Sequence, residues 1–354
     1  MGILKRTGPS RGRSALLRAW VICLAGFAAM PAMAEEAMDK IAVLTSDPAN
    51  DYGFNQQGVV AAEAVAKKRG LEILIGDGLG FGDIRPTLRE MAEEGADLII
   101  AHSSSYNTAA AEVSKEIGVP VAVLDLPSAQ QPGQIADYTL SGHEGAFLAG
   151  QMAALMTTTG TVAVVVSGEP MVWNTQSAGF AQGVHYGNPK VKVIYALIGP
   201  NAYADAAAAR RVTEQVIAAG ADIIFGQGNG ASFGMMQAVE TTPSVKGGKV
   251  WYIDVIGDKR PLDKAGILLT SVLWDLESVY EKMLDDMKSG TFGTYQYQIG
   301  LADNSVRLLQ TDHIPADVWE KVMATREGIV NGSVKVERVF EAAAARALAD
   351  TVTE

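Results

Sequence analysis

Two short segments of the sequence pair an aromatic residue with an asparagine. Phe54-Asn55 follows an apolar run near the start of the chain, and Trp173-Asn174 follows a similar run 119 positions later. Aromatic side chains at matched positions of two repeats could hold a flat ring face-on. Either residue alone is more often a helix cap or a hydrophobic staple. Because the pair recurs, we expect all four residues to contact a ligand.

Two aspartates follow strand-like runs in a similar way. Asp125 comes after Val121-Ala122-Val123-Leu124, and Asp254 comes after Val250-Trp251-Tyr252-Ile253. An Asp at a strand end commonly caps a turn. Beside aromatic faces, however, a carboxylate suits a flat ring that carries hydrogen-bond donors. We therefore predict that Asp125 and Asp254 face the same ligand.

The elements that would position these residues alternate between short β-branched runs and longer amphipathic stretches. Strands are expected at 41–44, 71–75, 97–100 and 120–124, and helices at 58–69, 86–94 and 107–117. Such alternation predicts an α/β fold with parallel sheets covered by helices on both faces.

The same order of elements returns after residue 160. Segments 41–43, 95–100 and 121–125 match 162–164, 220–225 and 250–254, at offsets of 121, 125 and 129. Ordered matches with slowly growing offsets predict two similar Rossmann-like lobes. Ligands of parallel α/β lobes bind at the carboxyl ends of the strands, so we expect the site between the lobes.

Sets of residues that would indicate an enzyme or a metal protein are missing from the sequence. The glycine-rich run 76–82 does not fit a dinucleotide motif and is interpreted as a flexible turn. No P-loop or G-x-S-x-G motif occurs, and the four histidines are scattered. We therefore expect a binding protein without catalytic residues, metal or cofactor.

The first 34 residues have the composition of a secretory signal. They carry five cations and no acid, an apolar run over 19–30, and Ala32-Met33-Ala34 as an A-x-A cleavage site. The apolar run is shorter than the roughly 20 residues needed to span a bilayer. The only cysteine, Cys23, lies inside this run after Ile22, so we expect an exported protein without a lipid anchor.

Charge narrows the class of ligand. The whole chain has a net charge of -11, and without residues 1–34 it has 24 cations against 40 acids, a net charge of -16. This balance disfavours nucleic acid as a partner. The loops expected to line the cleft contain Lys259 and Arg260 as their only cations, so a neutral or weakly basic ring fits better than a phosphate.

Several motifs resemble those of the basic membrane protein family, the PnrA-like receptors of ABC transporters that bind purine nucleosides. The similarity covers nearly the whole chain after residue 34 and is carried by Asp51 to Gln56, Glu144 to Gly150, Ser177 to Gly183, Gly220 to Phe225 and the glycine-rich segment to Gly230. The resemblance implies a type I periplasmic-binding fold, with two hinged lobes that close on the ligand, and an ABC permease as partner.

The resemblance also implies roles for individual residues. Phe54 would stack on the base, Asp51 and Asn55 would bond the base or its surroundings, and Asp125 would contact the base edge. The glycine-rich loop, with Gly228 and Asn229, would let backbone approach the ligand.

Departures from the family pattern concern the ribose. The family's ribose-binding aspartate corresponds to Asp254 or Asp258, and Trp274 stands where the nucleoside binders have a lysine. Ser103 and Ser104 replace a Gly-Phe pair. These changes weaken the prediction of ribose binding and leave a free nucleobase or another ring open.

Taken together, we predict a periplasmic solute-binding receptor of an ABC importer for a purine nucleoside or nucleobase-like ligand. A receptor for a sugar or an amine, and a sensory receptor without transport, are alternatives. We expect lobe 1 to comprise 39–140 and about 259–290, lobe 2 to comprise 141–258 and about 291–340, and 341–354 to form a helical tail. The crossings between lobes are expected near 138–142, near 254–258 and after Gly290, and a helix over 276–288 is expected to return to lobe 1.

Overall fold

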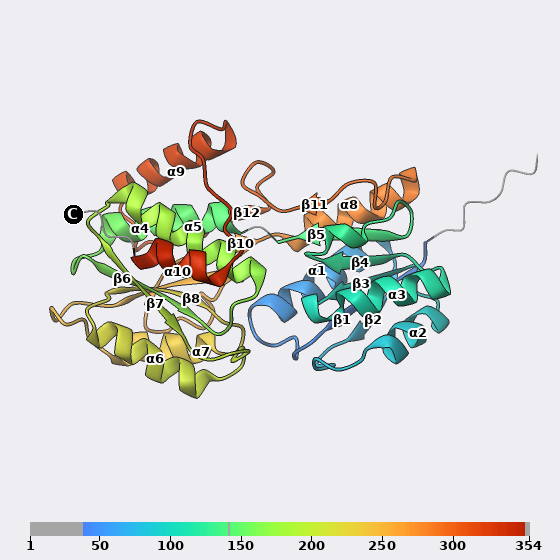
Figure 1. Ribbon diagram of the computed structural model, residues 1–354, viewed down its shortest axis with the longest axis horizontal. Coiled ribbons are helices and arrows are strands. Elements are labelled where there is room, and N and C mark those ends of the chain that lie inside the picture. The colour runs from blue at the N-terminus through green and yellow to red at the C-terminus, as the bar shows by residue number, and fades with distance from the viewer. Residues whose placement is uncertain (1–37, 141, 351–354) are drawn as a thin grey trace, which may run out of the picture. The chain divides into compact units, whose positions relative to one another are not determined.

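Two parallel-rich sheets dominate the computed structural model, which describes residues 38–140 and 142–350 (Figure 1). The predicted signal segment 1–34, with Cys23, lies outside the described residues. Within them, no helix combines the length and the apolarity needed to cross a bilayer. Each sheet with its covering helices is called a lobe below.

The first sheet has six strands in the order β11-β5-β4-β3-β1-β2. Its elements are β1 (Lys40–Thr45), α1 (Phe54–Arg69), β2 (Glu72–Gly76), α2 (Arg85–Glu93), β3 (Leu98–His102), α3 (Asn107–Ile117), β4 (Val121–Leu124), β5 (Ile135–Thr139), α8 (Leu276–Ser289) and β11 (Tyr297–Gln298), with short 3-10 turns η1 (Ser104–Tyr106) and η2 (Pro127–Ala129). Side chains of β1 alternate between two cores: Ile41 and Val43 pack with α1, whereas Ala42 and Leu44 pack with α2 and α3. Burial on both faces explains why this strand is continuously apolar.

The second sheet also has six strands, in the order β12-β10-β9-β8-β6-β7. Its elements are α4 (His143–Met156), β6 (Thr161–Val166), α5 (Met171–Gly187), β7 (Lys192–Leu197), α6 (Ala206–Ala218), β8 (Ile223–Gln227), α7 (Ser232–Thr241), β9 (Trp251–Ile256), β10 (Leu268–Trp274), β12 (Val306–Leu308), α9 (Ala316–Val330) and α10 (Ala342–Asp350). The order matches that of the first sheet strand for strand, with β6 in the place of β1. The predicted α/β fold with two similar lobes is confirmed.

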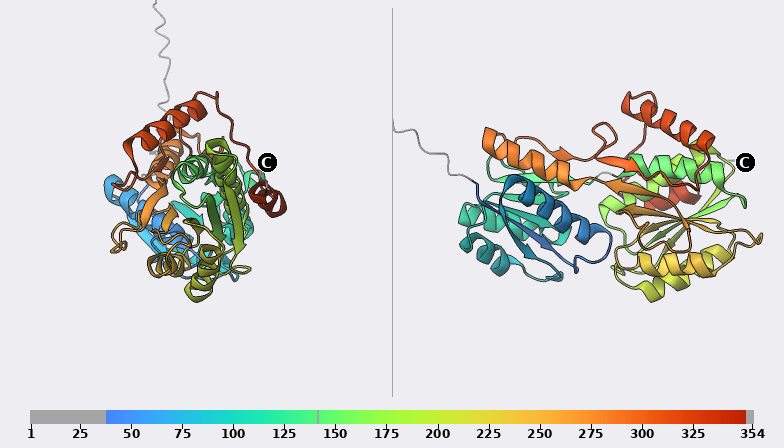
Figure 2. Two further views of the ribbon diagram at one scale, coloured as in Figure 1. Left: turned by 90° about the vertical axis from the view of Figure 1, so that its left-hand side faces the viewer. Right: turned by 180° about the vertical axis from the view of Figure 1, so that it is seen from behind.

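Between residues 38 and 350, the chain passes from one sheet to the other after β5, after β10 and after β11. The helix expected over 276–288 is α8, and it packs on α1 of lobe 1, where Arg69 binds Glu281 and Asp285. Figure 2 shows this orange helix beside the blue α1 in the view from behind.

Two expected lobe boundaries need correction. β10 falls in the range assigned to lobe 1, yet it pairs in parallel with β9 in the second sheet, so no crossing occurs near 254–258. β11 falls in the range assigned to lobe 2, yet it pairs with β5 in the first sheet. The loop between β9 and β10 contains no helix. Successive parallel strands are usually joined by a helix, so the sequence did not indicate that β10 continues the second sheet.

Glycines explain two of the family-like motifs. Helices α4 and α5 pack so closely that a Cβ added at Gly150 would overlap the carbonyl oxygen of Phe180, and one added at Gly183 would overlap that of Phe147. The motifs 144–150 and 177–183 therefore supply a backbone-to-backbone helix contact under the second sheet.

We expect Gly183→Ala to lower the free energy of unfolding by about 3 kcal/mol, because the added methyl group meets backbone that cannot rotate away. Urea denaturation measures this loss. Gly248→Ala is the control, since a Cβ at Gly248 meets no atom within 4 Å. Equal stability of the two variants would contradict the close packing of α4 on α5.

Candidate functional site

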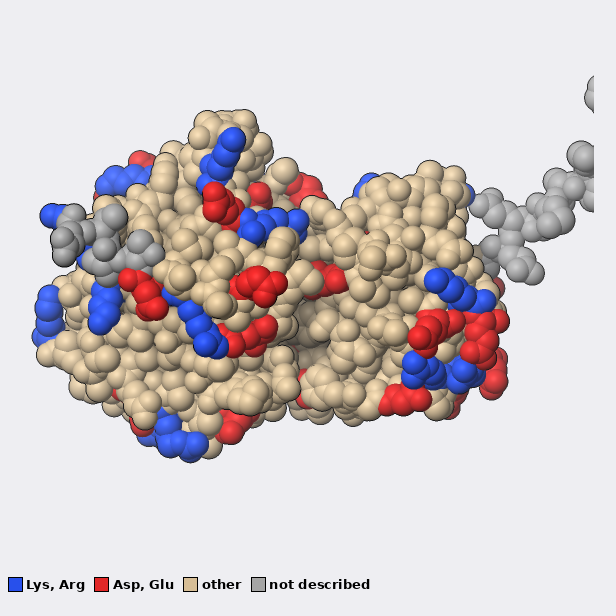
Figure 3. All heavy atoms as spheres, in the orientation of Figure 1, with Lys and Arg blue, Asp and Glu red and all other residues tan. Residues whose placement is uncertain are grey.

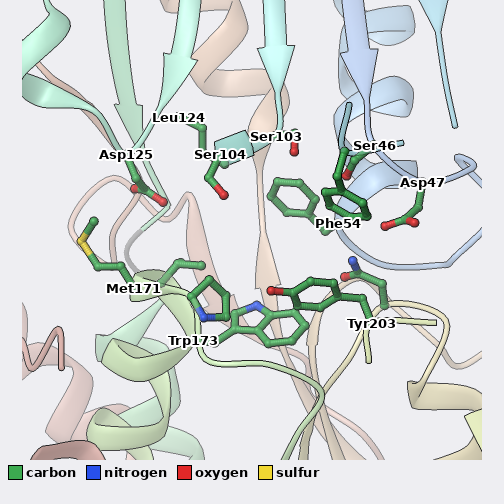
Figure 4. A pocket seen from close by; sticks show the side chains of 14 residues that line it. Ser46, Asp47, Phe54, Ser103, Ser104, Leu124, Asp125, Met171, Trp173 and Tyr203 are labelled. Carbon is green, nitrogen blue, oxygen red and sulfur yellow. The ribbon is translucent and has the colours of Figure 1, made fainter. Parts of the chain in front are cut away.

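A cavity of about 140 Å³ lies where the carboxyl ends of strands from both sheets meet (Figure 4). Its lining from lobe 1 is Ser46, Asp47, Phe54, Phe81, Ser103, Ser104, Leu124 and Asp125, and its lining from lobe 2 is Pro170, Met171, Val172, Trp173, Tyr203 and Asn229. Leu124 is the last residue of β4, and the other lining residues follow β1 to β4 in one sheet and β6 to β8 in the other.

The two halves of the lining correspond in sequence. Matched pairs at offsets of 119, 122 and 125 are Phe54 with Trp173, Phe81 with Tyr203, and Ser104 with Asn229. Each pair follows the equivalent strand of its own sheet. Four aromatic side chains, two from each lobe, therefore surround one space.

Phe54 offers one face to the cavity because His102 covers the other. The two rings stack with centroids 4.0 Å apart and an interplanar angle of 16°. His102 Nε2 donates to the backbone oxygen of Phe54 at 3.0 Å, which leaves Nδ1 as an acceptor. The hydroxyls of Tyr138 (2.8 Å) and Tyr280 (3.1 Å) both lie at hydrogen-bond distance from this Nδ1, whose one lone pair accepts from one of them at a time. Burial lowers the pKa of His102 to about 4, so the ring is neutral. Gly58 makes room, since a Cβ there would overlap the imidazole.

Asp51 and Asn55 hold the loop that carries Phe54 and do not line the cavity. The Asp51 carboxylate accepts from the backbone N–H groups of Gly53 (2.9 Å), Asn55 (3.1 Å) and Gln56 (3.0 Å), and from the Asn55 side chain (2.9 Å). These bonds satisfy the free N–H groups at the start of α1. Asp51 and Asn55 therefore have a structural role in this loop, which does not require a contact with a ligand.

The lobe 2 wall consists of residues 170–173 at the start of α5. Trp173 meets Tyr203 edge to face, with centroids 5.2 Å apart at 77°. The ring centroid of Tyr203 in turn lies 6.3 Å from that of Phe81 in the other lobe. Asn174 does not line the cavity: its amide donates to the backbone oxygens of Glu169 (3.1 Å) and Phe340 (2.8 Å).

Asp125 is the carboxyl group best placed to titrate in the cavity. The residue adopts a left-handed backbone conformation (φ 54°) directly after β4. Burial, reinforced by the neighbouring Asp137, raises the pKa of Asp125 to about 7. Burial and Asp51 also raise the pKa of Asp47, on the opposite side of the lining in Figure 4.

Neutral polar groups complete the lining. Asn229 Oδ1 is buried and has no hydrogen-bond partner among the described residues. Ser103 Oγ bonds Ser105 Oγ at 2.8 Å. A buried acceptor without a partner requires water or a ligand.

Four further predicted site residues lie outside the lining. Asp254 is fully buried within β9, where it pairs with Lys259 and accepts from the Tyr252 hydroxyl at 2.9 Å. Asp258 is held by Arg260 Nε at 2.9 Å. Trp274 packs where the chain leaves β5, so that a Cβ at Gly142 would lie 2.6 Å from its Nε1. Gly228 precedes the lining residue Asn229 and packs near Ala231, Met235 and Ser167.

Phe81 and Tyr203 were not expected from the sequence. Phe81 belongs to the glycine-rich run interpreted as a flexible turn, but that run is bonded to the end of β1: the amides of Leu79 and Gly80 donate to Thr45 and Ser46. An aromatic at an offset of 122 after the second strand of each lobe was the available signal.

Positive charge is absent from the lining, all of which lies within the described residues. The two cations expected near the site, Lys259 and Arg260, are each paired with an aspartate. Figure 3 shows acidic side chains at the margin of the hollow between the lobes. Residues 38–140 and 142–350 place no group of three or more His, Cys, Asp or Glu side chains to hold a metal ion.

Comparison with known families decides what kind of protein carries this cavity. The model of the PnrA-like ABC transporter substrate-binding proteins (Bmp) matches residues 38–339. The chain belongs to this family. It is therefore an ABC transporter solute-binding protein, and its partners are a small-molecule ligand and a permease.

Relatives and solved structures agree with this membership. A CD4+ T-cell-stimulating antigen of Listeria monocytogenes is 26% identical, covering 81% of this chain and 84% of the relative. An ABC transporter nucleoside-binding protein, BmpA, of Lactococcus lactis is 22% identical, covering 84% and 88%. A solute-binding protein of an ABC transporter system from Conexibacter woesei has the same fold, with a TM-score of 0.71 at 22% identity, covering 86% of this chain and all (100%) of that one.

The raised pKa of Asp125 predicts how stability depends on pH. The folded protein holds this proton up to about pH 7, whereas the unfolded chain releases it near its ordinary pKa of about 3.9. Stability from this group is therefore lost as pH rises from about 4 to 7. We expect Asp125→Asn to be more stable than the wild type at pH 8, with a difference that vanishes near pH 4, in urea denaturation at both pH values. A variant that is less stable at pH 8 would contradict the raised pKa.

Proposed function

We propose that this protein binds a purine nucleoside or nucleobase in the cavity between its lobes and delivers it to its permease. The observation that carries the proposal is the ring of four aromatic side chains, contributed in matched pairs by both lobes. Flat heterocycles are held by aromatic faces at low cost in conformational entropy.

The polar lining suits the edge of a base. Asp125 and Asp47 accept hydrogen bonds from ring N–H or amino groups when ionised, and Asp125 donates when protonated. Asn229 offers a buried oxygen that lacks a partner among the described residues. Without a Lys or Arg in the lining, a phosphate would have no counter-charge, so a nucleoside or base is favoured over a nucleotide.

Recognition of the base is proposed to dominate over recognition of the ribose. The family resemblance places a ribose-binding lysine at Trp274, which here packs beside Gly142 away from the cavity. Neither Asp254 nor Asp258 lines the cavity, and each is paired with a cation. Stacking and edge contacts would then supply most of the binding energy.

Transport completes the proposal. A relative named as a nucleoside-binding protein supports the ligand class. The signal-like segment 1–34 supports export to the periplasm, where the receptor would meet its permease. Ligand contacts to both lobes would favour a closed form, and that form would dock on the permease.

The ligand class can be tested by thermal shift, because a ligand that binds only the folded protein raises the unfolding midpoint. Inosine, guanosine, adenosine and their free bases are compared with ribose, arabinose and a set of amines. We expect the purine compounds to raise the midpoint, and the free bases to retain most of the effect. A shift with a pentose or an amine but with no purine compound would overturn the proposal.

Phe54→Ala and Trp173→Ala test the stacking directly. Each variant is expected to weaken purine binding about tenfold or more, since a base loses one aromatic face. Titration calorimetry measures the affinity, and Tyr186→Ala, which removes an exposed ring of α5 outside the cavity, is the control. Wild-type affinity in both variants would leave the two aromatics with a packing role only.

Affinity should also depend on pH through Asp125. If a ring N–H donates to the ionised carboxylate, the dissociation constant rises about tenfold per unit below pH 7 until the carboxyl is fully protonated in the complex. In Asp125→Asn this dependence should disappear. Titration calorimetry of the wild type and the variant at pH 5, 6, 7 and 8 measures this dependence. A wild-type affinity that is constant over this range would place the ligand away from Asp125.

A further inference from the structure

The chain continues beyond the region that defines its family. The family model ends at residue 339, and the described structure then continues through α10 to Asp350. α10 packs on α5 and β7, with Ala345 and Ala349 buried in the contact. Figure 1 shows this dark red helix beside α5.

The polar contacts of this segment converge on one carboxylate. Arg346 forms a two-pronged pair with Glu169, from Nε to Oε1 at 2.8 Å and from Nη2 to Oε2 at 2.5 Å. The Tyr195 hydroxyl of β7 also donates to Glu169 Oε1, at 2.9 Å. The Arg346 guanidinium lies 5.6 Å from the Tyr195 ring centroid. Planar, two-pronged pairs of this kind fix orientation as well as distance.

Two further contacts fasten the approach to α10 along α5. Gln182 and Glu337 exchange two hydrogen bonds of 2.9 Å, each between the Gln182 amide and the Glu337 backbone. Closer to the cavity, the Asn174 amide bonds the backbone oxygens of both Phe340 and Glu169. Asn174 thus joins the C-terminal segment to the residue held by Arg346.

Glu169 directly precedes the lobe 2 wall of the cavity. The next four residues, 170–173, all line it, and they include Trp173. The first turn of α5 is closed by the amides of Trp173 and Asn174, which donate to the oxygen of Pro170 at 2.9 and 3.0 Å. A displacement of Glu169 would therefore move the indole face offered to the ligand.

We infer that the C-terminal segment 340–350 positions the ligand-binding wall 170–173 through the Arg346–Glu169 pair. Arg346 and Glu169 are positioning residues, since neither lines the cavity. The segment lies outside the matched family region, residues 38–339. The expected effect of this pair on ligand affinity rests on the proposed function. Its expected effect on the position of residues 170–173 does not.

Hydrogen–deuterium exchange of the protein without ligand tests the positioning itself. Arg346→Met is compared with Arg346→Lys, Glu169→Gln and Arg211→Met, the last a matched removal of an exposed arginine on α6. We expect Arg346→Met and Glu169→Gln to accelerate exchange at the Trp173 and Asn174 amides about fivefold. Loss of a partly exposed ion pair changes the equilibrium for local opening by up to about fivefold. Arg346→Lys should restore part of the protection, and Arg211→Met should leave it unchanged.

Two exchange patterns would overturn the inference. One is equal exchange at residues 171–174 in Arg346→Met and Arg211→Met. The other is faster exchange throughout both lobes in Arg346→Met, which would show that α10 only stabilises the fold. In protein that binds inosine, we expect Arg346→Met and Glu169→Gln, but not Arg211→Met, to weaken inosine affinity about fivefold. Failure of the wild type to bind inosine would count against the ligand proposal, and the exchange pattern would still decide the role of α10.

Discussion

The position of the strand ends in the two sheets determines where the ligand cavity of this protein lies. In a parallel sheet all carboxyl ends lie along one edge, and the loops that follow them gather there. Both sheets have the same strand order, and the loops after β1 to β4 and after β6 to β8 contribute to one cavity. The aromatic pairs, the titrating Asp125 and the lobe 2 wall all follow from this arrangement.

The cavity is prepared by residues that never reach it. His102 covers the back of Phe54, burial keeps that imidazole neutral, and the hydroxyls of two tyrosines contact its Nδ1. Asp51 fixes the loop before α1. On the other side, Glu169 anchors the wall that carries Trp173. A lining supported in this way loses little conformational freedom when a ligand binds, so more of the contact energy appears as affinity.

The fold and part of the candidate site could be predicted from the sequence. Recurrence identified Phe54 and Trp173, because equivalent loops keep similar offsets in both halves. Asp254 was paired with Asp125 by the same reasoning, but β9 continues two residues further, to Ile256, and buries Asp254 against Lys259. Strand length and burial partners are set by tertiary packing, which local patterns do not contain. Phe81 was missed because its glycine-rich loop reads as flexible, although backbone hydrogen bonds tie it to β1.

A crystal structure of the protein with inosine or guanine is the most direct measurement of the central claim. The account predicts a purine ring between the free face of Phe54 and Trp173, with a ring N–H or amino group at hydrogen-bond distance from Asp125. A purine bound outside the space enclosed by the four aromatic side chains, or one that contacts a single lobe, would contradict it.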